Sequence, residues 1–388
     1  MSERIQDSHI SGTLKQLSTP WKIASERAYR LSKMNVIKEG YILDIACGSG
    51  IQLSAYSSQL NKPCLGIEID AGRAEIARKT LKLTLEKNLL KNSEIIIGDC
   101  LKISKLKLNK NIKFSLLHLD SARPTDMQSH TLDEMQPPPI EAIKIWKKLL
   151  IENNEAIILD LSPRLSISQC RNLKKRLEEV LPDLNQTWEW SSQGRGRVDR
   201  LSVWIGNAST KNKKSRYVRI HPKEIENSVL VESNKLPWEH ESILLENHNV
   251  KPNEFISIID PALIASGLND TWLKLQNCEY KWIRKEGRRP LIVHTTKLDS
   301  KDENENLIFE SGIVREIISH DINNGVEPLI KLGNNLELKQ LTLRMKISPD
   351  LQPKLQSRID KNLLDIGGSG FVVKLPNNML AICVKTNI

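Results

Sequence analysis

The amino-terminal half of the chain alternates short apolar runs with segments of helical period. The apolar runs predict buried strands at 41–46, 64–69, 93–98, 114–119 and 155–161. Helices are predicted at 51–60, along the stripe formed by Ala77, Leu81, Leu85 and Leu89, in the proline-led segment 137–153, and at 168–181. Strands that alternate with helices predict right-handed βαβ units, and therefore a parallel sheet with helices on both faces.

The pattern changes after residue 181. Two further strand runs, at 187–190 and 201–206, are joined by SSQGRGRVDR, which contains glycines but no helical pattern. Two strands linked by such a turn pair antiparallel. The sequence therefore predicts an α/β domain whose parallel sheet ends in an antiparallel hairpin.

The remaining chain has a different pattern. The polar, lysine-rich stretch 206–216 predicts a domain boundary, after which EFISII predicts a strand and PALIASGL a helix. The acidic, polar stretch 297–307 is typical of an exposed loop. The predicted organisation is a helical lead-in over 1–35, an α/β domain over 36–208, a connecting segment over 209–300, and a small α+β module over 301–388.

Within the last module the local signals are strong. QLTLRMKI predicts a strand, and a helix is expected from Pro349 to about Leu363, with Ser348 as its N-cap. GFVVKL and MLAICVK predict two strands joined by a turn at Asn377 and Asn378.

Composition bounds the class of protein. Hydrophobic residues make up 39% and charged residues 27% of the 388 residues, the balance of a folded globular protein. No apolar run approaches the ~20 residues that cross a bilayer, and the start, MSERIQDSHI, lacks the apolar core of a secretory signal. The six cysteines form no C-x-x-C pair, so we expect reduced, mostly buried thiols and no metal site. These features predict a cytoplasmic protein.

Charge points to a polyanionic partner. The formal net charge is +10, and the segment from Arg195 to Lys223 holds nine basic residues and one acid. A solvated loop is one explanation, and a surface that contacts phosphates is the one we favour. The residues expected to make such contacts are Arg195, Arg197, Lys211, Lys213, Lys214 and Arg216.

The sharpest chemical pattern is DIACGSG, from Asp44 to Gly50, after the first predicted strand. Glycines there allow positive φ and a close approach of backbone to a ligand. Acidic residues then end or follow each of the next predicted strands, so four carboxylates are expected along the carboxyl edge of the sheet, where open α/β proteins bind ligands. The expected cofactor contacts are Asp44, Ala46, Cys47, Gly48, Gly50, Glu68, Ile69, Asp99, Cys100 and Asp120.

The charge of this edge separates two classes of nucleotide cofactor. A dinucleotide site directs a helix N-terminus at an anionic pyrophosphate and uses the pattern G-x-G-x-x-G. Leu53 stands where the third glycine would be. An edge lined with acids suits a ligand without phosphate and with positive charge, such as the sulfonium and ammonium groups of S-adenosylmethionine. A structural tight turn without a ligand is the alternative.

These residues resemble class I methyltransferases, whose first motif is D-x-G-x-G-x-G. Asp44 to Gly50 match that motif, with Ala46 in place of its first glycine. By this resemblance, Glu68 would accept hydrogen bonds from the ribose and Asp99 from the adenine amino group. The resemblance also implies a Rossmann-like seven-stranded sheet with an antiparallel final hairpin.

More narrowly, the chain resembles microbial methyltransferases with a C-terminal THUMP-like domain. Their G-V-D-L-D corresponds to 66–70, their D-P-A-R to 120–123 with serine for proline, and their E-P-D-P-A-V-I-R-A-G-L to 258–268. The module from about Phe309 resembles the THUMP-like domain in layout. Because THUMP domains bind RNA, this resemblance implies methylation of an RNA such as tRNA or rRNA.

The chemistry at the acceptor depends on residues after the fourth strand. Amine methyltransferases that act on a flipped base carry an aromatic residue where this chain has Arg123. Asp120 and Arg123 are therefore the expected catalytic residues, Asp120 as a hydrogen-bond acceptor and Arg123 as a base-stacking or phosphate-holding group. Cys100 and Cys170 are expected to be buried rather than nucleophilic, and His118 to be a buried structural histidine.

Two other functions remain open at this point. The departure at 120–123 allows a non-catalytic RNA-binding or regulatory protein that retains the cofactor pocket. A small-molecule methyltransferase is the other alternative.

Overall fold

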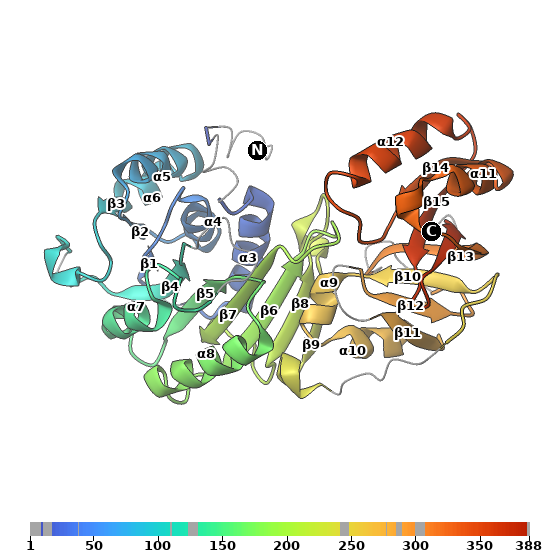
Figure 1. Ribbon diagram of the computed structural model, residues 1–388. Coiled ribbons are helices and arrows are strands. Elements are labelled where there is room, and N and C mark those ends of the chain that lie inside the picture. The colour runs from blue at the N-terminus through green and yellow to red at the C-terminus, as the bar shows by residue number, and fades with distance from the viewer. Residues whose placement is uncertain are drawn as a thin grey trace. The chain divides into compact units, whose positions relative to one another are not determined.

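A computed structural model describes residues 9–10, 18–37, 39–108, 111–122, 131–240, 248–276, 278–284, 289–298 and 307–385. The chain divides into two compact units, and each is considered by itself (Figure 1). The first consists of Met1–Gln193 and Val198–Glu239, and the second of Gly194–Arg197 and His240–Ile388.

The first unit is built on a mixed sheet with the order β3-β2-β1-β4-β5-β7-β6-β8-β9. The strands are β1 Tyr41–Asp44, β2 Cys64–Glu68, β3 Glu94–Ile97, β4 Phe114–Asp120, β5 Ala156–Leu161, β6 Gln186–Ser192, β7 Arg200–Gly206, β8 Ser215–Arg219 and β9 Val229–Ser233. The first five strands are mutually parallel, and β7 runs antiparallel to both β5 and β6. The predicted parallel sheet with an antiparallel final hairpin is confirmed.

The expected seven-stranded sheet is wrong in its strand number. Within the described residues the sheet has nine strands, because β8 pairs parallel with β6 and β9 pairs antiparallel with β8. The segment 209–300, predicted as a connection, is therefore divided: β8 and β9 extend the first sheet, whereas the strands that follow belong to a second sheet.

Helices cover both faces of the first sheet, as predicted. Figure 1 shows α3, α4 and α5 on one face and α7 and α8 on the other. Their bounds are α3 Trp21–Met34, α4 Ile51–Leu60, α5 Ala71–Thr84, α6 Lys87–Lys91, α7 Pro139–Trp146 and α8 Ile167–Val180. The predicted stripe through Leu89 is interrupted, because Leu85 has extended backbone and ends α5, and a separate short helix, α6, follows.

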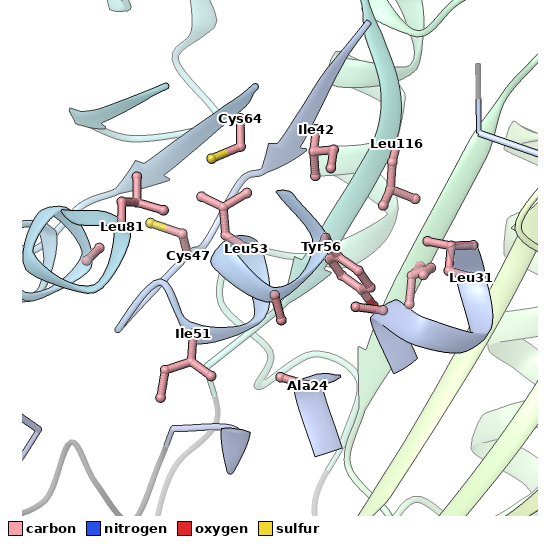
Figure 2. Close-up of a cluster of buried hydrophobic side chains, with 14 of the residues drawn as sticks. Ala24, Leu31, Ile42, Cys47, Ile51, Leu53, Tyr56, Cys64, Leu81 and Leu116 are labelled. Carbon is pink, nitrogen blue, oxygen red and sulfur yellow. The ribbon is translucent and has the colours of Figure 1, made fainter. Parts of the chain in front are cut away.

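A hydrophobic cluster fills the layer between the sheet and helices α3–α5. Figure 2 shows Leu31 of α3, Tyr56 of α4 and Leu81 of α5 in this cluster with Ile42 of β1 and Leu116 of β4. The cluster includes Cys47, so it also contacts the loop between β1 and α4 from the interior of the unit.

The second unit contains a seven-stranded sheet with the order β11-β12-β10-β13-β16-β15-β14. Its elements are β10 Phe255–Ile259, α9 Pro261–Ala265, α10 Asn269–Leu273, β11 Tyr280–Arg284, β12 Leu291–His294, β13 Ile308–Ser319, α11 Glu327–Asn335, β14 Leu338–Leu343, α12 Gln352–Asn362, β15 Gly368–Lys374 and β16 Met379–Val384. Neighbouring strands pair antiparallel except β14 and β15. Strands before and after residue 301 thus share one sheet.

The local predictions in the second unit hold in part. The strands around the turn at Asn378 are confirmed as β15 and β16, and Asn378 has a φ of 62°. The helix start is wrong: α12 begins at Gln352, and Pro353 occupies its first turn. Ser348 instead accepts the amides of Leu351 and Gln352 through its carbonyl oxygen, in a turn that precedes the helix.

Among the residues described here, no helix is both long and apolar enough to cross a membrane.

Candidate functional site

The loop after β1 is shaped by two glycines. Gly48 and Gly50 have φ of 52° and 75°, in the left-handed region that favours glycine, and Gly50 is the N-cap of α4. A Cβ on Gly50 would lie 3.0 Å from the Cα of Ala77, so its absence lets α4 pack against α5. A Cβ on Gly48 would meet nothing within 4 Å. The backbone at Gly48 therefore faces open space.

The amides of this loop are used inside the protein. The Ile45 amide donates to the carbonyl of His118 over 3.2 Å, and the Cys47 amide to that of Ile67 over 3.0 Å. The Ala46 amide donates to Asp44 Oδ1 over 3.1 Å, and the Gly48 amide to Glu68 Oε2 over 2.8 Å. A phosphate-binding loop would present such amides to the ligand. Here the Gly48 amide already donates to the carboxylate of Glu68 instead of to a bound phosphate.

Glu68 ends β2 as a buried carboxylate. Its second oxygen, Oε1, accepts from the Asp70 amide over 3.0 Å. The next residue, Ile69, is 71% exposed, and Ile97 at the end of the neighbouring strand is 46% exposed. The carboxylate of Glu68 and the exposed side chains of Ile69 and Ile97 thus lie at the same edge, where β2 and β3 end.

Asp99 and Cys100 follow β3. Asp99 accepts from the Leu101 amide over 3.0 Å and pairs with Lys102 Nζ over 2.8 Å. The hydrogen bond from Lys102 lowers the pKa of Asp99, which keeps it anionic. The Cys100 carbonyl accepts from Trp146 Nε1 over 2.9 Å, which ties this turn to α7.

The cysteines expected at the cofactor site are protonated thiols. Cys47 points into the hydrophobic cluster beside Leu53 and Leu81 (Figure 2), and burial raises its pKa. Burial raises the pKa of both Cys100 and Cys170 to about 12. Both are buried, as predicted, and a thiol held protonated is a poor nucleophile.

Asp120 ends β4 at the same edge of the sheet. Its Oδ2 lies 3.2 Å from Arg200 Nη1, and Arg200 Nη2 donates to Thr19 Oγ1 over 2.6 Å. The ion pair joins β4 to the start of β7. Arg123, the other expected catalytic residue, lies outside the described residues.

Asp44 does not face the open edge. It is 1% exposed, and its Oδ2 lies 2.8 Å from His118 Nδ1. On the other side of the ring, His118 Nε2 lies 3.3 Å from Asp160 Oδ2, and Asp160 forms a bidentate pair with Arg27 of α3. Asp44 therefore anchors the loop from below, through a buried network that ends in α3.

The predicted basic surface is divided, because Arg195 and Arg197 belong to the second unit, whereas Lys211, Lys213 and Lys214 belong to the first. Ala156, which begins β5, pairs with Gly206, which ends β7, so the loop that holds Lys211, Lys213 and Lys214 starts from the amino edge of the parallel strands. The connection 193–199, which carries Arg195 and Arg197, leaves and rejoins the sheet at the opposite, carboxyl edge.

Arg216 is a further correction. It was expected to contact phosphate, but it is 2% exposed and its Nε donates to Glu189 Oε2 over 2.6 Å. Arg30 of α3 also pairs with Glu189, and the guanidinium carbons of Arg30 and Arg216 lie 4.6 and 4.8 Å from the Trp204 ring centre. Arg216 thus belongs to the core. Arg195, Arg197, Lys211 and Lys214 are exposed, and Lys213 is half-buried.

Within the described part of the chain, no three His, Cys, Asp or Glu side chains gather in a way that could hold a metal ion.

A comparison with a solved structure agrees with this architecture. A solved structure from Porphyromonas gingivalis W83, assigned as a methyltransferase, superimposes with a TM-score of 0.60 at 15% identity, over 97% of this chain and 83% of that one. The first unit has the class I methyltransferase fold. A precorrin-6y C5,15-methyltransferase from Geobacter metallireducens GS-15 matches 52% of this chain and 93% of that one at 16% identity, with a TM-score of 0.32. No family model matches the chain.

One curated protein matches locally in sequence. Over 85 residues the chain is 35% identical to a protein of Methanococcus vannielii named as a cobalt-precorrin-6B C(15)-methyltransferase (decarboxylating). The match covers 22% of this chain and 44% of that protein, so the chain spans less than half of this relative's length.

The prediction of a buried structural His118 is confirmed, but the pairings at the site were not predicted. Asp44 contacts His118, which also contacts Asp160, and Asp120 pairs with Arg200. Arg27 lies 133 positions before its partner Asp160. The one available signal was the presence of single ionisable residues inside otherwise apolar runs, in YILD, FSLLHL and AIILDL. Ionisable side chains in buried strands need partners, and the ionisable side chains of adjacent strands could be those partners.

Proposed function

We propose that the first unit is an S-adenosylmethionine-dependent methyltransferase. The observation that carries this proposal is the carboxylate of Glu68, held by the Gly48 amide at the carboxyl edge of the sheet. A carboxylate there can accept from ribose hydroxyls and attracts a cationic ligand, and Leu53 stands where the dinucleotide fingerprint has its third glycine. The open space at Gly48 and the exposed apolar Ile69 fit a cofactor that carries both a charged and an aromatic part.

The edge offers a group for each part of the cofactor. Glu68 would accept hydrogen bonds from the ribose hydroxyls, and Asp99 from the adenine amino group, with Ile69 against the adenine face. Gly48 would line the methionine end. Ala46, Cys47, Gly50 and Cys100 would contribute backbone, because their side chains are absent, small or turned inward. When bound, the cofactor supplies an electrophilic methyl group on a positively charged sulfur.

Asp120 would face the methyl group and accept a hydrogen bond from the target atom. Its ion pair with Arg200 would set the orientation of its carboxylate, and Thr19 would hold Arg200 in turn. Methyl transfer is an in-line displacement, so orientation of the acceptor would supply most of the rate acceleration. Arg123 would act on the acceptor from the segment that follows.

RNA is the proposed substrate. The formal charge of +10 favours a polyanion, and Arg195 and Arg197 are exposed on the connection between β6 and β7. A THUMP-like role for the second unit in binding RNA belongs to the same proposal.

A small-molecule substrate is the second candidate. The local match to a protein named as a cobalt-precorrin methyltransferase favours it. A methyltransferase of that kind would methylate a compound in a metabolite extract and would not require the exposed Arg195 and Arg197.

The cofactor assignment is tested by calorimetric titration with S-adenosylhomocysteine. Glu68→Ala should weaken binding by about 2–4 kcal/mol, because two charge-assisted hydrogen bonds are lost and water replaces them in part. Glu75→Ala, which removes an exposed acid of α5, is the matched control and should leave the affinity unchanged. Equal affinities for both variants would contradict the assignment.

The substrate assignment is tested by transfer of a labelled methyl group to RNA that lacks modification. Transfer to RNA supports the proposal, and transfer only to a compound in a metabolite extract supports the second candidate. Cofactor binding without any transfer supports a non-catalytic RNA-binding or regulatory protein that retains the cofactor pocket.

A matched pair of double variants then locates the surface that binds RNA. Arg195→Ala with Arg197→Ala should lower the log–log salt slope of RNA binding by about 0.7 for each phosphate of a single strand that is no longer neutralised. Lys211→Ala with Lys214→Ala removes the same charge from the loop before β8 and should change the slope less. Equal slopes for the two double variants would contradict a specific role of Arg195 and Arg197 in binding RNA.

A further inference from the structure

Three ionisable side chains stand side by side in the central strands of the first unit. Asp44 of β1 and His118 of β4 are direct register partners, and Asp160 of β5 lies two residues beyond the partner of His118. All three are almost fully buried, with exposed fractions of 0–1%. They form one continuous chain of contacts beneath the loop that holds Gly48.

Both nitrogens of the His118 ring face carboxylate oxygens. Nδ1 lies 2.8 Å from Asp44 Oδ2 and Nε2 lies 3.3 Å from Asp160 Oδ2. An ionised carboxylate only accepts hydrogen bonds, and a neutral imidazole carries a single N–H. Two such contacts therefore require the doubly protonated ring.

The charge balance of the buried cluster leads to the same protonation state. With Asp44, Asp160 and Arg27 ionised, a neutral His118 leaves a net charge of −1 away from water, whereas an imidazolium makes the cluster neutral. An uncompensated buried charge is costly, so the neutral cluster is favoured.

The other groups around the ring do not change this balance. Tyr56 of α4 lies edge-on to His118, with ring centres 5.6 Å apart. The pKa of its hydroxyl is raised, by burial above all, so Tyr56 stays neutral. Burial alone would lower the pKa of His118, but the two carboxylates outweigh it and raise the pKa to about 9.

We propose that His118 is a positioning residue for the cofactor loop, and that its imidazolium holds Asp44 in the orientation that fixes the Ala46 amide. Asp44 divides its oxygens between the two neighbours: Oδ2 faces His118, and Oδ1 accepts from Ala46. The inference rests on the proposed function, because it takes the loop at Gly48 to be where S-adenosylmethionine binds.

Loss of the His118 proton would change the loop in a defined way. A neutral ring turns a lone pair toward one of the two carboxylates, so one of the two interactions becomes repulsive. If Asp44 moves, the Ala46 amide loses its acceptor and the backbone that leads to Gly48 loses one of its constraints. Cofactor affinity should then fall, although the added negative charge would by itself attract a cationic ligand.

The first test uses the unaltered protein. NMR of the full chain with labelled histidine, alanine and glycine follows the His118 ring and the carbons of Ala46 and Gly48 across a pH titration without ligand. We expect a protonated ring at pH 7 and a coincident transition of ring and loop near the pKa of about 9. A neutral ring at pH 7, or a ring transition that leaves Ala46 and Gly48 unchanged, would overturn the proposal.

The second test measures S-adenosylhomocysteine binding by calorimetry in His118→Gln. Glutamine can donate to one carboxylate but carries no charge, so the other buried carboxylate is left without a donor. We therefore expect the affinity at pH 7 to fall about tenfold. The ratio of the wild-type affinity to the variant affinity should approach one at pH 10. The ligand's own ammonium also titrates, and taking the ratio removes that contribution.

The matched control is His294→Gln, which removes a buried histidine from the second unit. It should leave the affinity and its pH dependence unchanged. A ratio for His118→Gln that equals one at pH 7, or that stays constant across the titration, would overturn the proposal. If His118→Gln does not fold, the NMR titration decides.

The two proposals fail in distinguishable ways. If the unaltered protein binds no S-adenosylhomocysteine at pH 7, the proposed function fails, whereas the coupling of the His118 ring to Ala46 is still measured. If it binds and the affinity ratio is one, only the role of His118 fails.

Discussion

Two buried histidines, one in each unit, have opposite surroundings. His118 of β4 faces the carboxylates of Asp44 and Asp160, whereas His294 of β12 lies 2.8 Å from Ser257 Oγ and 2.7 Å from the Thr296 carbonyl. His294 Nδ1 donates to that carbonyl, and the hydroxyl of Ser257 donates to Ser311 Oγ over 2.8 Å. Two carboxylates therefore face the ring of His118, whereas these partners of His294 are uncharged.

The pKa values of the two rings follow from this difference. Burial lowers the pKa of His294, and the hydrogen bond to the Thr296 carbonyl only partly opposes it. The two carboxylates raise the pKa of His118 to about 9 in spite of equal burial. Burial alone therefore does not decide the charge of a core histidine; its partners do.

The same contrast extends beyond the two rings. The first unit ties α3 to its sheet with buried ion pairs, among them Arg27 with Asp160 and Arg30 with Glu189. Arg30 also pairs with Glu26 along α3. Burial alone would raise the pKa of Glu189, but the charges of Arg30 and Arg216 outweigh it and lower this pKa to about 2. In the second unit Ser257, Ser311 and His294 form a neutral buried group.

Removal of a charged partner should have the largest effect. Asp160→Asn leaves Arg27 buried without its counterion and should destabilise the first unit by about 3–5 kcal/mol. Hydrogen exchange of peptides from β4 and β5 measures this locally, with peptides from β10 and β12 as the internal reference. A loss below about 1 kcal/mol in β4 and β5 would show that the ion pair is not what holds α3 to the sheet.

The pH dependence of stability should differ in sign between the units. The pKa of His118 is higher in the folded chain than the ordinary 6.5. Its contribution to the free energy of unfolding is therefore complete below pH 6.5 and is lost as the pH rises to about 9. The loss is on the order of 3 kcal/mol, at about 1.4 kcal/mol per pKa unit. His294, with a lowered pKa, should instead cost stability as pH falls below 6.5. Protection factors of β4 and β12, corrected for intrinsic exchange, give both slopes, and equal signs would refute the contrast.

Loss of a neutral partner should have the smallest effect. Ser257→Ala leaves His294 Nε2 without its hydrogen bond and should cost about 1–2 kcal/mol in the second unit. Exchange of peptides from β10 and β12 measures it. A cost equal to that of Asp160→Asn would mean that charge is not the source of the difference between the two cores.

The fold of the first unit could be predicted because its signals are local. Buried parallel strands are continuous apolar runs, and β1, β2, β4 and β5 are found where those runs lie. The strand β8 was missed because its sequence, SRYVR, lies in a lysine-rich stretch and contains two arginines. One of these, Arg216, is buried only because Glu189 of β6 neutralises it.

The candidate site could be predicted in its backbone and its acids, but not in their orientation. Asp44, Glu68, Asp99 and Asp120 lie at the ends of consecutive strands or just after them, as their spacing indicated. That Asp44 turns inward depends on His118, 74 positions later, and on the strand register that joins them. The basic cluster could not be resolved from sequence for a similar reason, since Arg216 is buried against Glu189 of β6, and Arg195 and Arg197 belong to another unit than the lysines.

The most direct test of the central claim is a calorimetric titration of the full chain with S-adenosylhomocysteine and with NADH under identical conditions. The protein should bind S-adenosylhomocysteine and reject the dinucleotide, because the edge is lined with acids and Leu53 stands where the dinucleotide fingerprint has its third glycine. Binding of NADH without binding of S-adenosylhomocysteine would contradict the account.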